Sequence, residues 1–351
     1  MIPALAIIGT GSIARFHLEA FVAQGTTVKV ISDLNAESAK PWCAALKATF
    51  VPNWEQAVCD PAINTVVICT PTPFHFPIAL AALKAGKHVV CEKTLGMTAS
   101  ESAELTRVAE TSGLQLHTGY MKRFFPAVQR AKALMPRLGR ITGAYFKTHQ
   151  PTPTDLVGDV AHEAFSPVAG KPSGVMRMAG GGILTCGCSH LVDMILHLIG
   201  LPSAVSGHQL HRPVSDLELV YHGLLHYPEG HAVHLDGTWH ARNGLGHGGE
   251  GWDEVFTIDG TNGRIVLETP VWNLPAARPC RLRVYLRDEG WSEPEFPALC
   301  AFAAFERHVL ANLAAGQQDP AMDARTGHRA DVVLEALYRA ADDGILVPLT
   351  W

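Results

Sequence analysis

The chain has 351 residues, 47% of them hydrophobic and 17% charged, which is the composition of a folded protein with more residues than one globular core usually holds. The net charge of -5 argues against a general nucleic-acid binder, because neutralising phosphates requires a clustered basic excess. No run of about 18 apolar residues predicts a membrane span.

The cysteines and the N-terminus bear on the compartment. Eight cysteines are scattered along the chain, several of them in apolar runs such as TVVICTP and HVVCEK, where buried thiols are ordinary. The apolar stretch at the N-terminus has no basic region before it and no cleavage site after it, so it does not resemble an export signal. We therefore expect a cytoplasmic protein without a disulfide framework.

The first expected elements are a strand in ALAII, a glycine turn and a helix. Gly9, Gly11 and Ala14 fit the pattern G-x-G-x-x-G/A of dinucleotide-binding proteins. The first glycine permits a tight turn, the second lets the backbone approach a pyrophosphate, and the small third residue lets the helix pack on the strand. The phosphates would lie at the helix N-terminus, so we predict cofactor contacts from Gly9, Gly11, Ser12 and Ile13.

A second strand, TVKVISD, ends in Asp33 at the distance from the glycines where a ribose-binding carboxylate is expected. A carboxylate accepts hydrogen bonds from ribose hydroxyls but repels a 2′-phosphate, and Leu34 and Asn35 follow it in place of an arginine. We therefore expect NAD, with NADP less favoured. The alternative is a glycine turn and a solvated aspartate in an unrelated α/β unit.

Strands and helices continue to alternate up to about residue 122. NTVVICTPTPFH contains a buried strand at 66–69, FPIALAALKAG is helical, KHVVCEKTLG is a strand, TASESAELTRVAETSG is a capped helix and LQLHTGY is a short strand. Repeated units of this kind predict a parallel, doubly wound (Rossmann) sheet, in which ligands bind at the carboxyl ends of the strands. The residues expected at that edge are Gly9, Asp33, Thr70, Pro71, His75, Glu92, Lys93 and Tyr120.

The pattern changes from about Arg123. GRITGAYFKTH alternates like a strand, a long polar loop follows from Pro151 to Ala179, and LVDMILHLIG is an amphipathic helix. Further strands are expected in LELVYHGLLHYPEG, HAVHLDGTWHAR, DEVFTIDGTNG and RIVLETP, before two closing helices. We predict a dinucleotide-binding domain at 1–122 and a substrate-binding and oligomerisation domain at 123–351, with the closing helices able to pack back on the first domain.

The ordered motifs resemble the Gfo/Idh/MocA family (glucose–fructose oxidoreductase, inositol dehydrogenase and rhizopine catabolism). They are GTGSIA, VVICTPTPFH, GKHVVCEK, GYMKRFFP, GGGILTCGCSH, IDGTNGRIVLE and the terminal DARTGHRADVVLEALYRAADDG. The resemblance implies a Rossmann domain followed by an α/β domain with a large, open, mostly antiparallel sheet. It also implies a homodimer or homotetramer formed through that sheet, and oxidation or reduction of one carbon of a sugar, cyclitol or related polyol.

The family motif EKP reads Glu92-Lys93-Thr94 here, with threonine in place of proline. The resemblance implies that Lys93 lies near the nicotinamide and the substrate. A lysine at the carboxyl end of a parallel strand is also placed to orient a substrate hydroxyl and stabilise a developing alkoxide. The alternative is that Lys93 is exposed to solvent without a functional role, as most lysines at strand ends are.

The stretch GGGILTCGCSH resembles the family motif G-G-G-x-L-x-D-x-G-x-H. The resemblance implies that His190 is the catalytic base and that Cys186 stands where the family has aspartate. If a helix begins here, positions four apart share one face, so both side chains would point to one substrate carbon. Histidine titrates near neutral pH and suits the role of base, although His190 could also be a hydrogen-bonded interior histidine. We expect Gly180–Gly182 to bring the backbone close to the substrate.

Cys186 leaves several interpretations open. A thiol is a weaker hydrogen-bond partner than a carboxylate, so one interpretation is a substrate that differs in hydroxyl pattern or carries a negative charge. A second interpretation is that the cysteines are small residues that pack beneath a substrate loop. A zinc site formed by Cys186, Cys188 and His190 is a minor alternative because C-x-C-x-H lacks the common zinc spacing, and we predict no metal. A disulfide between cysteines two apart would be strained.

Other substrate contacts are predicted on both sides of the pocket. The long loop offers His162, Glu163, Lys171 and Arg177, of which His162 and Arg177 are the substrate-binding candidates. On the Rossmann side, Tyr120 and the pair Lys122–Arg123 are the candidates, with Tyr120 and Arg123 predicted to bind substrate.

Together these predictions describe an NAD-dependent dehydrogenase that acts on a secondary hydroxyl of a sugar, cyclitol or related polyol, with Lys93 and His190 as acid/base and oxygen-positioning groups. One alternative is a lyase or hydrolase that retains NAD and works through a transient keto intermediate. Another is a non-catalytic, sugar-responsive regulator.

Overall fold

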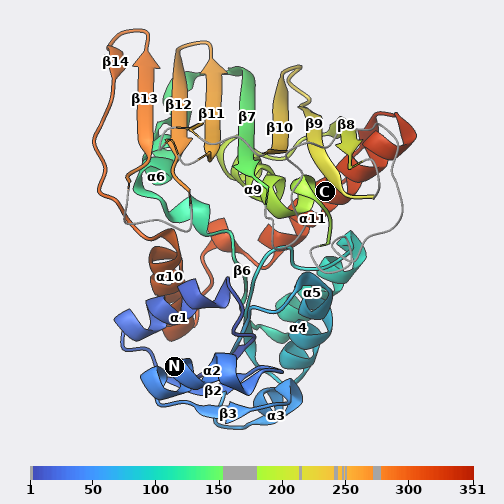
Figure 1. Ribbon diagram of the computed structural model, residues 1–351. Helices are drawn as coiled ribbons and strands as arrows, with labels where there is room; N and C mark the ends of the chain where they lie inside the picture. Colours follow the sequence, from blue (N-terminus) through green and yellow to red (C-terminus); the bar gives the residue numbers. More distant parts are fainter. Residues whose placement is uncertain are drawn as a thin grey trace. The chain divides into compact units, whose positions relative to one another are not determined.

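The computed structural model describes residues 3–152, 180–212, 216–240, 244–246, 249, 251–271 and 278–351. They form two compact units: one comprises Met1–Met121 and Phe302–Asp331, the other Lys122–Ala301 and Val332–Trp351 (Figure 1). The first unit therefore includes a segment from near the end of the chain. Within the described ranges, no helix has the length and apolar character needed to span a membrane.

The first unit is built on a six-stranded sheet in the order β3-β2-β1-β4-β5-β6, with every pairing parallel. This is the strand order of a Rossmann fold. The strands are β1 (Leu5–Ile8), β2 (Val28–Ser32), β3 (Thr49–Val51), β4 (Thr65–Ile68), β5 (His88–Cys91) and β6 (Leu116–Thr118). The helices are α1 (Ala14–Ala23), α2 (Ala36–Leu46), α3 (Trp54–Cys59), α4 (His75–Lys84), α5 (Ala99–Ser112), most of α10 (Ala301–Ala315) and the first turns of α11 (Arg325–Asp343), with the short η1 (Thr72–Phe74) and η5 (Pro320–Met322).

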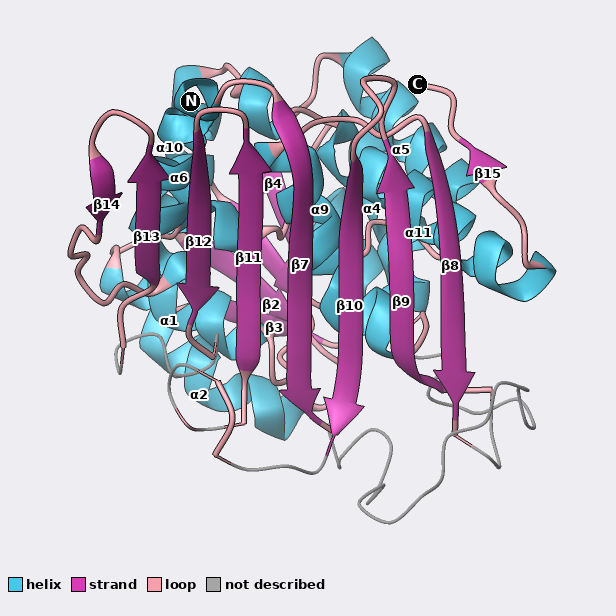
Figure 2. Cartoon of the chain, turned by 90° about the horizontal axis from the view of Figure 1, so that it is seen from above, coloured by secondary structure: helices cyan, strands magenta, loops and turns pink. Residues whose placement is uncertain are grey.

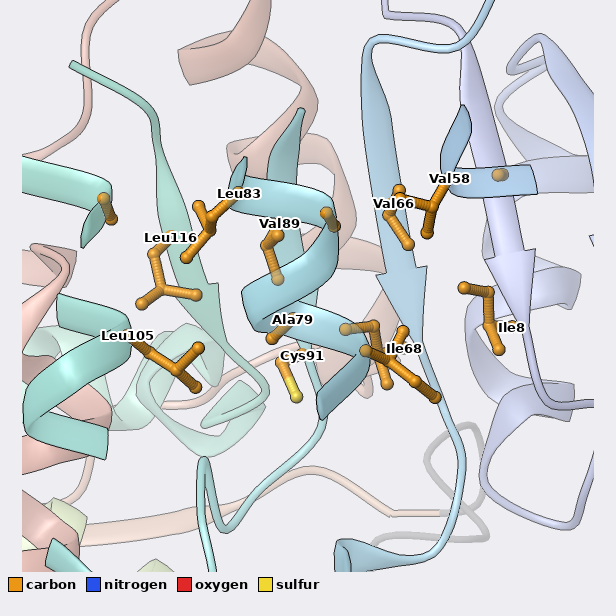
Figure 3. Packing of buried hydrophobic residues seen from close by; sticks show 14 of the residues in the cluster. Ile8, Val58, Val66, Ile68, Ala79, Leu83, Val89, Cys91, Leu105 and Leu116 are labelled. Atoms are coloured by element: carbon orange, nitrogen blue, oxygen red, sulfur yellow. The ribbon is translucent and has the colours of Figure 1, made fainter. Parts of the chain in front are cut away.

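The central strands are apolar along their whole length because helices flank the sheet. Every residue of β1 and β4 is buried. In one core cluster, side chains of β4 and β5 pack against Val58 of α3, Ala79 and Leu83 of α4 and Leu105 of α5 (Figure 3). Cys91 belongs to this cluster, so its thiol acts as a small apolar group.

The second unit is built on a nine-stranded sheet in the order β14-β13-β12-β11-β7-β10-β9-β8-β15. Only β7 and β10 pair in parallel, and the other pairs are antiparallel. The strands are β7 (Ile141–Pro151), β8 (Ala204–His211), β9 (Glu218–His226), β10 (Ala232–His240), β11 (Asp253–Gly260), β12 (Gly263–Thr269), β13 (Arg281–Leu286), β14 (Gly290–Ser292) and β15 (Val347–Pro348). The other elements are η2 (Met121–Phe124), α6 (Pro126–Leu134), η3 (Met135–Leu138), η4 (Leu184–Cys188) and α9 (Ser189–Leu198).

These two sheets confirm the predicted fold class, a parallel Rossmann sheet followed by a large, mostly antiparallel sheet. No strand was predicted at β3 of the first sheet or at β8, β13, β14 and β15 of the second. Helices α6 and α9 lie behind the second sheet in Figure 2. Side chains along β7 alternate accordingly: Phe146 is buried on the helix side, whereas Tyr145 on the other side is 39% exposed.

Residues 184–188 form one π-helical turn, η4, and α9 continues from it. The shared face of Cys186 and His190 was expected on the condition of a regular α-helix, and the π-helical turn does not meet that condition. The turn packs closely on β10, because a Cβ added at Gly237 would lie 2.1 Å from the sulfur of Cys188. Cys188 is fully buried, so the backbone of β10 and this thiol occupy the space that a larger side chain would need.

We expect Gly237→Ala to lower the midpoint of thermal unfolding, because overpacking at such a contact costs about 1–3 kcal/mol. Gly143→Ala in β7 is the matched control, since its Cβ would meet only the Ala232 carbonyl oxygen, at 3.7 Å. The double variant Gly237→Ala/Cys188→Ala should recover part of the loss. Equal midpoints for Gly237→Ala and Gly143→Ala would contradict this packing.

Candidate active site

The glycine turn after β1 has the close approach that a dinucleotide site needs. Gly9 has φ of 93°, and a Cβ there would lie 2.7 Å from the carbonyl oxygen of Cys69 at the end of β4. A Cβ at Gly11 would meet no described atom within 4 Å, so the space beside it is open. No described side chain caps the start of α1 at Ile13, which leaves its first N–H groups to bind an anion. These features fit a pyrophosphate.

Asp33 follows β2 and is held firmly beside this turn. One carboxylate oxygen accepts hydrogen bonds from the backbone N–H and the hydroxyl of Thr10, at 2.6 and 2.7 Å. The other oxygen accepts the N–H of Asn35 at 2.7 Å. A carboxylate offers about four lone-pair sites, so Asp33 can still accept bonds from ribose hydroxyls.

His75 connects the ends of β4 and β5. It is buried, with Nδ1 2.6 Å from the carbonyl oxygen of Thr94 and Nε2 2.8 Å from that of Thr70. Burial lowers the pKa of His75, so the ring is neutral and only one nitrogen can donate at a time. Both ring nitrogens face backbone oxygens, so His75 supports the strand ends. Pro71 is exposed. Contacts of Thr70, Pro71 and His75 with the cofactor stay predictions.

Lys93 and Glu92 follow directly after β5, at the carboxyl edge of the parallel sheet. Lys93 is half-buried, and the peptide bond to Thr94 is cis. The Glu92 carboxylate is buried inside the unit, where it accepts the N–H of Lys93 at 3.1 Å and contacts His17. Its two oxygens are thus used by the protein itself. Tyr120, which follows β6, is fully buried. Direct ligand contacts by Glu92 and Tyr120 stay predictions.

In the second unit, the three consecutive glycines lie against two side chains that the sequence analysis did not identify. Glu218, the first residue of β9, accepts the N–H of Gly182 at 2.9 Å and that of Leu184 at 3.0 Å. The hydroxyl of Tyr338 on α11 donates to the same carboxylate at 2.8 Å. A Cβ at Gly182 would lie 2.2 Å from the Glu218 carbonyl oxygen, and one at Gly181 would lie 2.1 Å from the Tyr338 hydroxyl.

Gly181 and Gly182 therefore bring the backbone close to Tyr338 and Glu218, and the approach of Gly180–Gly182 to a substrate stays a prediction. The sequence signal was weak: Glu218 is one carboxylate at the start of an otherwise apolar strand, LELV. Glutamate is rarely buried unless it is paired, so Glu218 in an apolar strand could have been predicted to have a partner. Nothing in the sequence indicated which residues those partners are.

His190 is the second residue of α9 and is buried, three residues before Asp193, which forms an ion pair with Arg123 of η2. Arg123 donates to both carboxylate oxygens of Asp193 at 2.6 to 3.1 Å, and both side chains are buried. This two-point contact holds the first turns of α9. Lys122 is also buried and paired within this unit, with Glu254. A substrate contact by Arg123 stays a prediction, and the structure assigns its guanidinium a supporting contact.

The two cysteines of the motif differ in environment. Cys188 is fully buried, and burial raises the pKa of its thiol well above the usual range. Cys186 is half-buried and its sulfur lies 3.7 Å from the carbonyl oxygen of Gly181. All eight cysteines fall in described parts of the chain and none forms a disulfide. The described residues contain no group of three or more side chains suited to a metal ion.

The loop candidates cannot be placed in the same way. His162, Glu163, Lys171 and Arg177 all lie outside the described residues.

Comparison with known proteins identifies the family of the chain. Residues 4–120 match a family model described as an oxidoreductase family with an NAD-binding Rossmann fold, GFO_IDH_MocA, and residues 128–266 match the C-terminal domain model of the same family. The chain belongs to the Gfo/Idh/MocA oxidoreductase family. The predicted cofactor, NAD, is thereby confirmed as the cofactor of the family's N-terminal domain.

Two curated relatives and one solved structure show what the chain is similar to. It is 30% identical over 217 residues to levoglucosan dehydrogenase of Pseudarthrobacter phenanthrenivorans, covering 57% of this chain and 52% of that protein. It is 29% identical over 219 residues to scyllo-inositol 2-dehydrogenase (NADP(+)) IolW of Bacillus subtilis, covering 62% and 58%. These matches therefore span little more than half of either relative. A structure of levoglucosan dehydrogenase in complex with NADH and levoglucosan shares the fold, with a TM-score of 0.80, 23% identity and coverage of 99% of this chain and 100% of that one.

We expect Asp33→Asn to shift cofactor preference from NAD toward NADP by about tenfold, equivalent to about 1.4 kcal/mol, because the substitution removes the charge that repels a 2′-phosphate. The measurement is the dissociation constant of each reduced cofactor by fluorescence titration. Asp60→Asn is the matched control, since Asp60 also accepts a backbone N–H but precedes β4 and so lies at the opposite edge of the sheet. An unchanged ratio in Asp33→Asn would contradict the assignment.

Glu218 leads to a pH-dependent prediction. Burial raises its pKa from 4.5 to about 7, although hydrogen bonds from Tyr338, Leu184 and Gly182 oppose the shift. Between these two values the folded protein binds more protons than the unfolded chain, so the contribution of Glu218 to stability falls as pH rises from about 4.5 to 7, by about 3 kcal/mol in total.

The test is the pH dependence of thermal unfolding in wild type and Glu218→Gln. The difference in unfolding midpoint between wild type and Glu218→Gln should vary with pH between about 4.5 and 7 and be constant above pH 7. Tyr338→Phe removes a hydrogen bond that lowers the pKa of Glu218, so it should move the interval to higher pH. Parallel curves for wild type and Glu218→Gln would show that Glu218 does not titrate in this way.

Proposed function

We propose that this protein is an NAD-dependent dehydrogenase that oxidises a secondary hydroxyl of a sugar, cyclitol or related polyol, or reduces the corresponding ketone. The observation that carries the proposal is the position of Lys93. It follows β5 at the carboxyl edge of a sheet ordered β3-β2-β1-β4-β5-β6, the edge that also bears the glycine turn and Asp33.

Each predicted group has one chemical task. When bound, NAD accepts the hydride. The ammonium of Lys93 donates a hydrogen bond to the substrate oxygen and stabilises the negative charge that develops on it. His190 accepts the hydroxyl proton through its imidazole and returns it in the reverse direction. Glu218 and the Arg123–Asp193 pair hold the backbone before His190 and the helix that carries it.

The relatives support the substrate class. Levoglucosan and scyllo-inositol, named for the two relatives above, are both ring compounds with several hydroxyls. Both relatives are dehydrogenases, which favours net redox chemistry over an NAD-retaining lyase or a regulator. Cys186 in place of an acidic residue is where we propose that the substrate preference of this chain diverges.

We further propose a homodimer or homotetramer formed through the second sheet. On the second sheet, Tyr145 of β7, His222 of β9 and Asp236 of β10 line one open hollow. Tyr145 donates to Asp236, and His222 lies 3.4 Å from the same carboxylate, so this hollow is already partly organised. A monomer in light scattering after size-exclusion chromatography would overturn this part of the proposal.

The activity test is a panel of cyclic polyols, including levoglucosan and scyllo-inositol, with NAD or NADP, followed by absorbance of the reduced cofactor. We expect Lys93→Met and His190→Ala each to lower kcat about 10²–10⁴-fold, because each removes a group that acts on the reacting oxygen or its proton. Lys84→Met, an exposed lysine at the end of α4, is the matched control. Full activity in Lys93→Met or in His190→Ala would contradict the catalytic role proposed for that residue.

A further inference from the structure

Three ionisable side chains meet in the interior of the first unit. They come from three distant parts of the sequence: His17 on α1, Glu92 after β5 and Glu306 on α10. Their exposed fractions are 1%, 6% and 1%. The Nε2 atom of His17 lies 2.9 Å from Oε1 of Glu92, and Nδ1 makes a short contact with Oε1 of Glu306. Neither His17 nor Glu306 has a part in the chemistry described above.

The two carboxyl groups determine the charge of the imidazole between them. Burial lowers the pKa of His17, but the hydrogen bonds to Glu306 and Glu92 outweigh it and raise the pKa to about 10. His17 is therefore an imidazolium at neutral pH, with both ring N–H groups donating. Glu92 carries the balancing charge, because its bond from His17 lowers its pKa against the effect of burial.

The surroundings keep this charge away from water. The rings of Phe302 and Phe305 on α10 lie edge-on to His17, with centroids 5.1 and 6.4 Å away. Burial raises the pKa of Glu306, and its second oxygen, Oε2, has no hydrogen-bond partner among the described residues. The thiols of Cys69 and Cys91 are also buried in this unit, and burial raises their pKa so that they are neutral.

The cluster acts on one particular place in the backbone. Oε2 of Glu92, the oxygen that does not face His17, accepts the N–H of Lys93 at 3.1 Å. A Cβ at Gly119, after β6, would lie 2.7 Å from the other oxygen, so Glu92 is enclosed on that side as well. His17 therefore holds one end of a carboxylate whose other end holds Lys93.

We propose that His17 is a positioning residue for the nicotinamide reaction: supported by Glu306, it fixes the Glu92 carboxylate, and thereby the backbone that presents the ammonium of Lys93. The proposal rests on the proposed function only for the role of Lys93. Removing the charge of a buried pair is damaging because its partner stays uncompensated, so the loss of His17 should release Glu92 and loosen Lys93.

The first test needs neither cofactor nor substrate. Hydrogen exchange of the Lys93 amide reports directly on the bond to Glu92. We expect His17→Gln to speed this exchange by about tenfold or more, the factor that corresponds to losing one hydrogen bond of ordinary strength. His117→Gln is the matched control: His117 is a buried histidine of the same unit whose recorded partner is Gln115, and its loss should leave Lys93 unchanged.

The second test separates positioning from general damage. In His17→Gln the affinity for NADH should stay within about twofold while kcat with the best polyol of the panel falls by about tenfold, because only the Lys93 end of the site is loosened. Glu306→Gln keeps an oxygen that accepts from Nδ1, so its effect should be smaller than that of His17→Gln. Equal losses of cofactor affinity and kcat would indicate a structural role and overturn the proposal.

A third measurement uses the unaltered protein and so does not depend on a variant folding. Nitrogen NMR of histidine-labelled wild type should show His17 doubly protonated at pH 8.5, below its pKa of about 10. A neutral His17 at that pH, or unchanged Lys93 exchange in His17→Gln, overturns the proposal. Absence of any NAD-dependent turnover would instead overturn the proposed function, while the exchange and NMR results would still decide the role of His17.

Discussion

The ends of β1 and β4 approach each other so closely that only glycine fits at position 9, where a Cβ would lie 2.7 Å from the Cys69 carbonyl oxygen. The remaining features of the first unit depend on this contact. It lets the chain turn directly from β1 into α1, and it places the free N–H groups of that helix beside the carboxyl ends of β2, β4 and β5. Asp33, His75 and Lys93 follow those three strands.

Buried ionisable side chains lie next to the backbone of several predicted site residues. Glu92 and His17 lie behind Lys93, Glu218 lies behind the glycines that precede His190, and Arg123 with Asp193 holds α9. A buried ion pair is weak evidence for stability, because apolar residues of the same volume often serve as well. What a buried ion pair adds is a fixed orientation of the groups around it. A carboxylate that receives two or three specific hydrogen bonds leaves its neighbours little freedom to move.

Much of the first unit could be predicted because its signals are local. Gly9 to Ala14, Asp33 and the apolar runs of β1, β4 and β5 each follow from spacing and composition. The contacts of Arg123, Glu218, Tyr338 and Glu306 could not be predicted in the same way, because each joins residues that are far apart in the chain. Strand β14 was not predicted because its three residues are too few to show a pattern. Strand β13 was also not predicted, although its sequence RLRVYL alternates between buried and more exposed residues and so carries the signal of a strand.

The stretch GGGILTCGCSH shows the same division. The histidine and its motif were recognisable, but the expected shared face of Cys186 and His190 depended on an α-helix, and the structure has a π-helical turn at residues 184–188. The glycines turned out to accommodate Glu218 and Tyr338, and Cys188 to pack on β10 at Gly237. Of the two cysteines, Cys186 is the one we connect with substrate preference. It is half-buried and stands where the motif that the sequence resembles has an acidic residue.

The central claim is that the chain transfers a hydride from a polyol carbon to NAD. The most direct measurement uses a cyclic polyol deuterated at its carbinol carbons, with mass spectrometry of the cofactor after turnover. The account predicts reduced cofactor that carries one deuterium, formed in proportion to the ketone product. Product formation with unlabelled cofactor, or with no net reduced cofactor, would contradict it.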